Sequence, residues 1–356
     1  MSPGGAEDAL RFAGRTSLDP ARAVSRWKAL TGRKAAGCLP LFIPEEILHA
    51  AGMLPVTVCG DEYRDLPASG RWDVLDGWVL PPVSVLSSEF ATSLPEAASR
   101  RPQGSLRFSP GRTKVPSTEE TLDRVELLRE WAGETAGRPA SDGALERSIS
   151  VFNENRRLFF ALQDRLAAIP GAFSAVEVFL LFRSAMALPR EAHTELLRAA
   201  LSRDPANGRR SPARIFLAGV TASRALMQAI DDAGAFLVGE GLAAGNRTHE
   251  AMVDDGGDPA LALARRLRAQ LLGLAEATAE PSFAARMVDR VEASGANRFL
   301  YVGTDAAIPD APGRLAAEAG RRGIPSLCLE SDLAAPTPDR QEERIALFLA
   351  TGGKRY

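Results

Sequence analysis

The sequence contains few of the residues that bind metals most readily. Only three cysteines and three histidines occur among its 356 residues. The cysteines, Cys38, Cys59 and Cys328, are far apart and form no C-x-x-C pair. This spacing excludes a disulfide framework and leaves few soft ligands for a metal. Three scattered thiols are typical of a reducing compartment, and we expect a cytoplasmic protein.

Long apolar runs and an excess of one charge are also missing. No stretch approaches the roughly 18 apolar residues of a membrane span, and the first residues, MSPGGAEDALRFAGR, lack the pattern of a secretory signal. The 43 basic and 45 acidic side chains nearly cancel, so no overall field attracts nucleic acid or acidic membranes. We predict neither partner. The motifs of nucleotide hydrolysis, zinc proteases and serine hydrolases are absent as well.

Short apolar runs alternate with helical segments over much of the chain. Runs of this kind are typical of strands that helices cover on both faces. The predicted fold class is α/β, with two Rossmann-like doubly wound parallel-sheet domains joined by a helical middle segment. The predicted strands lie at residues 53–60, 72–85, 105–113, 214–220, 235–241, 298–304 and 324–332.

Composition divides the chain into four parts. The segment DPANGRRSPAR, residues 204–214, is rich in Pro, Gly and Arg and marks a boundary. The helix expected after Ser117 begins with a capping box formed with Glu120. We therefore expect an N-terminal helix, a first α/β domain, a helical segment and a second α/β domain, at residues 1–35, 36–117, 118–207 and 208–356.

Three stretches carry a resemblance to a known family. They are IPEEILHAAGMLPV at 43–56, RWDVLDGWVLP at 71–81 and ALERSISVFNENRRLFFAL at 144–162. In order and spacing they resemble the small benzoyl-CoA reductase subunits and the 2-hydroxyacyl-CoA dehydratase subunits. The resemblance implies two related subunits facing each other. It further implies a 4Fe-4S cluster on three cysteines in each subunit and a CoA thioester beside one cluster.

The sequence departs from the family where those cysteines are expected. After residue 81 it reads PVSVLSSEF, with Ser84 near the expected Cys-Asp, and the strands at 214–220 and 298–304 lead into Thr221 and Thr304. Hydroxyls are poor substitutes for the thiolates that iron–sulfur clusters require. We therefore predict no cofactor and no metal ligands. The two threonines are retained as candidate substrate-binding residues.

The remaining candidate site residues belong to the first α/β domain. Glu45 and Glu46 are candidate catalytic carboxylates because the resemblance places this helix start at the active site, with Ser84 as a hydrogen-bond donor. Carboxylates in a first helical turn also simply complement the helix dipole. His49, one turn later, and Arg107, in a basic segment suited to CoA phosphates, are candidate substrate-binding residues.

These features lead to one functional hypothesis and two alternatives. The leading hypothesis is a cluster-free relative, either a structural or regulatory subunit or an acyl-CoA-binding protein. Its partner would be a homologous cluster-bearing subunit or a second copy of the chain, with acyl-CoA as the ligand. The alternatives are an active subunit of an acyl-CoA dehydratase or reductase, and a lyase or transferase that acts on a CoA thioester through Glu45 or Glu46.

Overall fold

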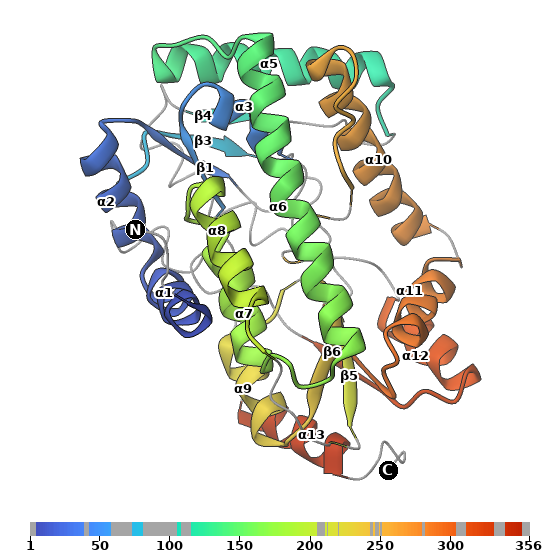
Figure 1. The fold of residues 1–356 in the computed structure, drawn as a ribbon. Coiled ribbons are helices and arrows are strands. Elements are labelled where there is room, and N and C mark those ends of the chain that lie inside the picture. Colours follow the sequence, from blue (N-terminus) through green and yellow to red (C-terminus); the bar gives the residue numbers. More distant parts are fainter. Residues whose placement is uncertain are drawn as a thin grey trace.

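A computed structural model of the chain confirms the α/β class. Two separate four-stranded sheets, both parallel, lie at opposite ends of the molecule with helices around and between them (Figure 1). The structure describes residues 5–38, 43–57, 73–80, 105–107, 115–204, 211, 213–219, 221–242, 245, 249, 251–279, 282–303, 311–330 and 339–350.

The first sheet has the strand order β2-β1-β3-β4. The strands are β2 (Leu54–Thr57), β1 (Ala35–Cys38), β3 (Gly77–Leu80) and β4 (Ser105–Arg107). The sequence predicted β2, β3 and β4, although the strands are shorter than expected. It did not predict β1, whose residues Ala-Ala-Gly-Cys are too small to give an apolar pattern.

The N-terminal helices flank this region. The predicted helix near residue 20 is α2 (Pro20–Thr31), which the Asp19 side chain caps and which ends at Gly32 in the left-handed conformation. A preceding helix, α1 (Ala6–Leu18), was not expected and packs on the helical middle of the chain. The short helix α3 (Glu45–Ala50) begins after Pro44, with Glu45 and Glu46 in its first turn as expected.

The helical middle consists of α5 (Thr118–Ala136), α6 (Asp142–Ala168), α7 (Ala175–Ser184) and α8 (Arg190–Leu201). The predicted capping box at the start of α5 is confirmed, with both of its hydrogen bonds present. At 27 residues, α6 is about 40 Å long and runs between the two sheets (Figure 1). It packs on α3, α8, α10 and the second sheet.

The second sheet has the order β6-β5-β7-β8. Its strands are β6 (Phe236–Leu242), β5 (Arg214–Gly219), β7 (Arg298–Gly303) and β8 (Ser326–Glu330), and the sequence predicted all four. Side chains alternate along β5, because a parallel strand presents successive residues to opposite faces.

Helices cover both faces of this sheet. Ile215 and Leu217 pack in one apolar cluster with α9 (Arg224–Asp232) and α13 (Asp339–Ala350), together with parts of α1, α6, α7 and α8. Phe216 and Ala218 pack in another cluster with α11 (Ser282–Ala293) and α12 (Ala311–Arg321). This arrangement explains the continuous apolar runs of the sequence.

One helix that follows β5 and β6 in the chain packs next to the first sheet. Helix α10 (Pro259–Ala279) packs on α5, and its buried residues join the apolar cluster of β1, β3, α3 and α5. The predicted limits of the four parts of the chain therefore stay a prediction. Within the described ranges, no helix combines the length and the apolar character needed to cross a bilayer.

Candidate polar site between the two sheets

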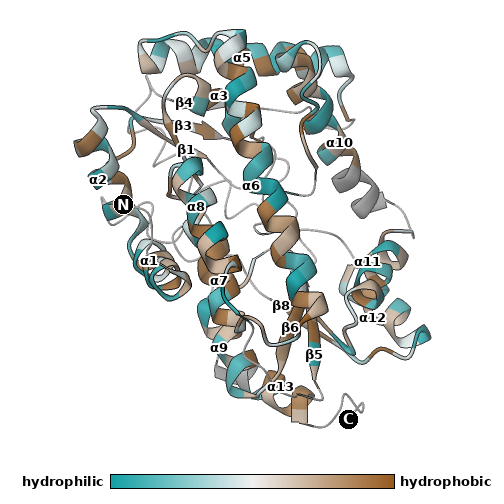
Figure 2. Ribbon diagram, in the orientation of Figure 1, coloured by the Kyte–Doolittle hydropathy of each residue, from teal (hydrophilic) through white to brown (hydrophobic). Residues whose placement is uncertain are grey.

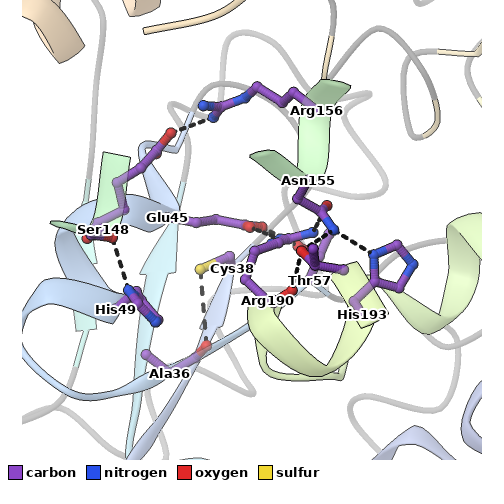
Figure 3. Close-up of polar contacts among 12 residues, drawn as sticks. Ala36, Cys38, Glu45, His49, Thr57, Ser148, Asn155, Arg156, Arg190 and His193 are labelled. Atoms are coloured by element: carbon purple, nitrogen blue, oxygen red, sulfur yellow. Dashed lines mark hydrogen bonds and ion pairs between the residues drawn. The ribbon is translucent and has the colours of Figure 1, made fainter. Parts of the chain in front are cut away.

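The predicted carboxylate Glu45 lies at the carboxyl edge of the first sheet, where ligands of α/β proteins commonly bind. Strands β1 and β2 end here with Cys38 and Thr57. The Thr57 hydroxyl donates to Glu45 Oε1 at 2.6 Å, and the Arg190 guanidinium donates to Glu45 Oε2 (Figure 3). The Glu45 side chain remains 20% exposed, whereas that of Arg190 is 6% exposed.

Glu46 points into the interior and pairs with Arg156 of α6. Both side chains are almost fully buried. Burial by itself would raise the pKa of Glu46, but the charges of Arg156 and Arg266 and the Arg156 hydrogen bond outweigh it and hold the pKa below its ordinary value. The carboxylate therefore stays ionised and is a poor general acid or base near neutral pH.

His49 connects α3 to two other helices. The Ser148 hydroxyl donates to the Glu46 carbonyl oxygen at 2.8 Å, so the Ser148 oxygen accepts from His49 Nδ1 at 2.9 Å. His49 Nε2 lies 3.0 Å from Glu191 of α8, and this hydrogen bond lowers the pKa of the Glu191 carboxyl. His49 also meets the Phe152 ring edge-on.

A second histidine, His193, is held neutral inside the molecule. Its Nε2 donates to the Leu181 carbonyl oxygen at 2.9 Å, so Nδ1 accepts from Asn155 Nδ2 at 3.0 Å. Asn155 also donates to Thr194 and accepts from Arg190. Burial, followed by the charge of Arg190, lowers the pKa of His193 to about 3.

His249 lies where three arginines converge. Its ring stacks on Phe159 with 4.0 Å between centroids. Burial and the charges of Arg190, Arg156 and Arg266 hold the pKa of His249 well below its ordinary value. Arg266 donates to the Ala251 carbonyl oxygen at 2.7 Å, and burial lowers its own pKa to about 9.

The segment around His249 is fixed to α6 by Asn153. The Asn153 amide donates to the Val253 carbonyl oxygen at 2.7 Å and accepts from the Val253 amide at 3.0 Å. Arg156 donates to the same Asn153 oxygen. Within the same FNENRR segment, Asn155 and Arg156 make polar contacts with α8 and α3.

The structure brings together some of the predicted site residues. Glu45, Glu46 and His49 share α3, whereas Thr221 follows β5 and lines a hollow with Phe182 and Glu240 at the second sheet. Arg107 ends β4, and its side chain is not described. Ser84 and Thr304 lie outside the described residues.

Among the residues of the polar site that were not singled out from the sequence are Arg190, His193, His249 and Arg266. The first two face the interior from the same side of α8, three residues apart, a spacing that places them on one helix face. This spacing was the available signal. The other two come from a loop and a helix far along the chain, so their approach could not be read from local patterns.

The cysteines do not fit a shared cluster site. Cys38 is buried in β1 and Cys328 lies in β8. These two strands belong to separate sheets (Figure 2). Burial raises the pKa of the Cys38 thiol well above its ordinary value and that of Cys328 to about 11. Cys59 lies outside the described residues. In the described ranges, no group of three His, Cys, Asp or Glu side chains is placed to hold a metal.

Comparisons with known proteins agree with the resemblance. The chain is 28% identical to one of the subunits of the benzoyl-CoA reductase of Thauera aromatica, over 80% of this chain and 79% of that protein. It is 21% identical to the (R)-phenyllactyl-CoA dehydratase beta subunit of Clostridium sporogenes, over 94% and 96%. The model of the family described as 2-hydroxyglutaryl-CoA dehydratase, D-component, matches residues 112–350. The chain therefore belongs to the 2-hydroxyglutaryl-CoA dehydratase D-component family.

Proposed function

We propose that this chain is a member of the family that binds no iron–sulfur cluster and acts as a structural or regulatory subunit or as an acyl-CoA-binding protein. The observation that carries the proposal is the placement of Cys38 and Cys328. They lie in separate sheets with thiols that favour the protonated form, while a cluster needs several thiolates converging on one point. One further cysteine, Cys59, cannot supply that set alone.

The contacts of the Glu45 and Glu46 carboxylates support a role in binding rather than in acid–base chemistry. Glu46 is buried and paired with Arg156, and Glu45 is engaged by Arg190 and Thr57. A general base needs a free lone pair and a pKa near the working pH. These contacts weigh against a lyase or transferase that uses either residue. Unchanged turnover of a candidate CoA thioester in both a Glu45→Gln and a Glu46→Gln variant would remove that alternative.

The relatives support a role in a larger assembly. They are named as subunits of a benzoyl-CoA reductase and of dehydratases that act on CoA thioesters. We propose that this chain pairs with a homologous cluster-bearing subunit or with a second copy of itself. Co-purification with a cysteine-bearing homologue would favour the first arrangement, and a colourless homodimer the second.

We further propose that each parallel sheet is the centre of a Rossmann-like domain, with residues 118–207 as the helical connector. The strand orders β2-β1-β3-β4 and β6-β5-β7-β8, with the first strand of each sheet next to the centre, support this assignment. The passage of α6 between the sheets supports the connecting role (Figure 1).

The experiment is calorimetric titration of the chelator-treated protein with benzoyl-CoA, with free CoA as the control ligand. The iron content of the same sample is measured. We expect saturable binding of the thioester by iron-free protein, unchanged in a Cys59→Ala variant. Binding that appears only after reconstitution with iron and sulfide, and that Cys59→Ala abolishes, would contradict the proposal. Absence of thioester binding would exclude the role as an acyl-CoA-binding protein. The role as a structural or regulatory subunit would remain, and co-purification tests it.

A further inference from the structure

We infer that Arg156, Arg190 and Arg266 form, around His249, a binding site for a small anion that carries a carboxylate or phosphate group. The site lies between the two sheets, where α6, α8 and α10 approach one another. The inference does not depend on whether the chain binds an iron–sulfur cluster, because none of the described cysteines takes part in it.

The first support is a pair of unused donors. Arg156 donates through its two terminal nitrogens to Asn153 and Glu46, and Arg190 donates in the same way to Asn155 and Glu45. The Nε atom of each arginine is buried, and neither has a hydrogen-bond partner among the described residues. The two side chains are 4% and 6% exposed. A buried N–H without a partner is costly and commonly marks the place of an ion or water.

The second support is that the two guanidinium groups lie against the same aromatic ring. Both lie against the ring of Phe152, at 4.6 Å from its centroid for Arg190 and 5.7 Å for Arg156. An aromatic ring stabilises the cations but offers no conventional acceptor to their N–H groups. An anion between the arginines would supply acceptors of the geometry that guanidinium groups bind best.

The third support is the balance of charge. The described part of the cluster contains three guanidinium groups and the two carboxylates of Glu45 and Glu46. His193 and His249 add no negative charge and are kept neutral by burial and by the arginines. Taking a guanidinium out of water costs several kcal/mol unless opposite charge compensates it. An anion beside Arg156 and Arg190 would add to the compensation that Glu46 and Glu45 supply.

His249 is the group through which an anion would be detected. It stacks on Phe159, with Phe182 of α7 nearby. The charged and titratable groups facing it are Arg156 of α6, Arg190 and His193 of α8, and Arg266 of α10. An anion among these cations would reduce the repulsion that opposes protonation of His249. Binding should therefore be accompanied by proton uptake.

The test is nuclear magnetic resonance of the imidazole groups, which is simple because the chain has three histidines. Acetate and inorganic phosphate are the probes, and acetamide is the neutral control. We expect at least one of the anions to shift the His249 signal saturably and to raise its pKa by about one unit. The His49 signal should shift less, because His49 is already held by Ser148 and Glu191 and is not among the groups whose charges act on His249. No saturable shift of His249 with either anion would overturn the inference and leave ordered water as the partner of the Nε atoms.

Two double variants distinguish anion binding at this site from a general effect of the charge of the protein. The double variant Glu45→Gln/Arg190→Gln removes one pair of the site, and Glu154→Gln/Arg157→Gln removes an exposed pair of α6 as the matched control. The first should weaken anion binding about tenfold, as expected for loss of one charge-assisted contact, and the second should leave it nearly unchanged. Equal effects would contradict the inference. Should the first variant not fold, Arg190→Lys keeps the charge without the Nε donor and should weaken binding by a smaller factor.

Discussion

At the scale of single residues, the interior between the sheets is organised by charged side chains that have specific partners. Glu46 and Arg156 pair where both are nearly inaccessible, and Asn153 and Ser148 complete their surroundings. Ion pairs of this kind are weak evidence for stability as a whole, because desolvation offsets much of their attraction. Removing one partner is a different matter, since the other charge is then buried alone.

The Glu46→Gln substitution should therefore lower the free energy of unfolding by about 3–5 kcal/mol. Urea denaturation measures this value. Glu154→Gln is the control, because Glu154 is 38% exposed and pairs with Arg157 and Arg198 at the surface. Its cost should stay below about 1 kcal/mol. Similar losses for the two variants would mean that the Glu46 pair is more solvated than the structure indicates.

His193 should make stability depend on pH. Its pKa is about 3 in the folded chain against 6.5 ordinarily, so the unfolded chain binds a proton at a higher pH than the folded chain. The free energy of unfolding should therefore fall as the pH drops from about 6.5 toward 3, by up to about 1.4 kcal/mol per pH unit from this residue. In a His193→Gln variant the slope should be smaller by that amount. An unchanged slope would contradict the assignment of His193 as buried and neutral.

The sequence revealed some of this site but not its partners. Glu45, Glu46 and His49 could be chosen because they share a short helix that resembles a family motif. Arg266 could not, because a charged residue on a helix is ordinarily solvated, and only the packing of α10 buries it. For Arg190 the spacing to His193 on α8 was the one local signal. The arrangement around His249 depends on contacts between segments some 100 residues apart in the chain.

At the scale of elements, local signals predicted most helices and strands. A few consecutive residues are enough to predict the capping box of α5 and the apolar strands β5, β6, β7 and β8. β1 is the exception, because its residues are small to leave room for the side chains that pack on them. Gly37 lies beneath the Trp78 ring, and a side chain there would lie 2.6 Å from it. Such a strand is determined by the sheet rather than by its own β propensity.

Gly219 at the end of β5 should tolerate no side chain. Its φ is +135°, and a Cβ atom would lie 1.8 Å from the Val302 carbonyl oxygen of β7. Gly219→Ala should lower the free energy of unfolding by about 2–4 kcal/mol, through backbone strain and the steric clash together.

Gly234→Ala is the matched control for Gly219. Gly234 also has a positive φ, of +67°, but no atom of the described residues lies within 4 Å of an added Cβ. Its cost should be about 1 kcal/mol, from the left-handed conformation alone. Thermal or urea denaturation compares the two variants, and equal costs would exclude the close approach of β5 and β7 as the cause.

At the scale of the whole molecule, two helices tie the sheets together. α6 packs on α3 near the first sheet and on β6 of the second, and α10 returns from the second half of the chain to pack on α5. This crossing could not be read from sequence patterns, because helix periodicity gives the apolar face and not the surface that covers it.

The Asn153→Leu substitution should loosen this connection. It removes both hydrogen bonds to Val253, whose backbone is then left without those partners although its side chain is buried. The loss should be about 1–3 kcal/mol. Hydrogen exchange should accelerate at the Val253 amide more than in β5 or β7. Unchanged protection there would show that α10 is held by apolar packing alone.

Iron and acid-labile sulfide, measured in the chain after purification without oxygen, decide whether this member of the family binds an iron–sulfur cluster. We expect colourless protein with far less than one iron atom per chain. Brown protein with several iron atoms and equivalent sulfide per chain, retained through gel filtration, would contradict this expectation.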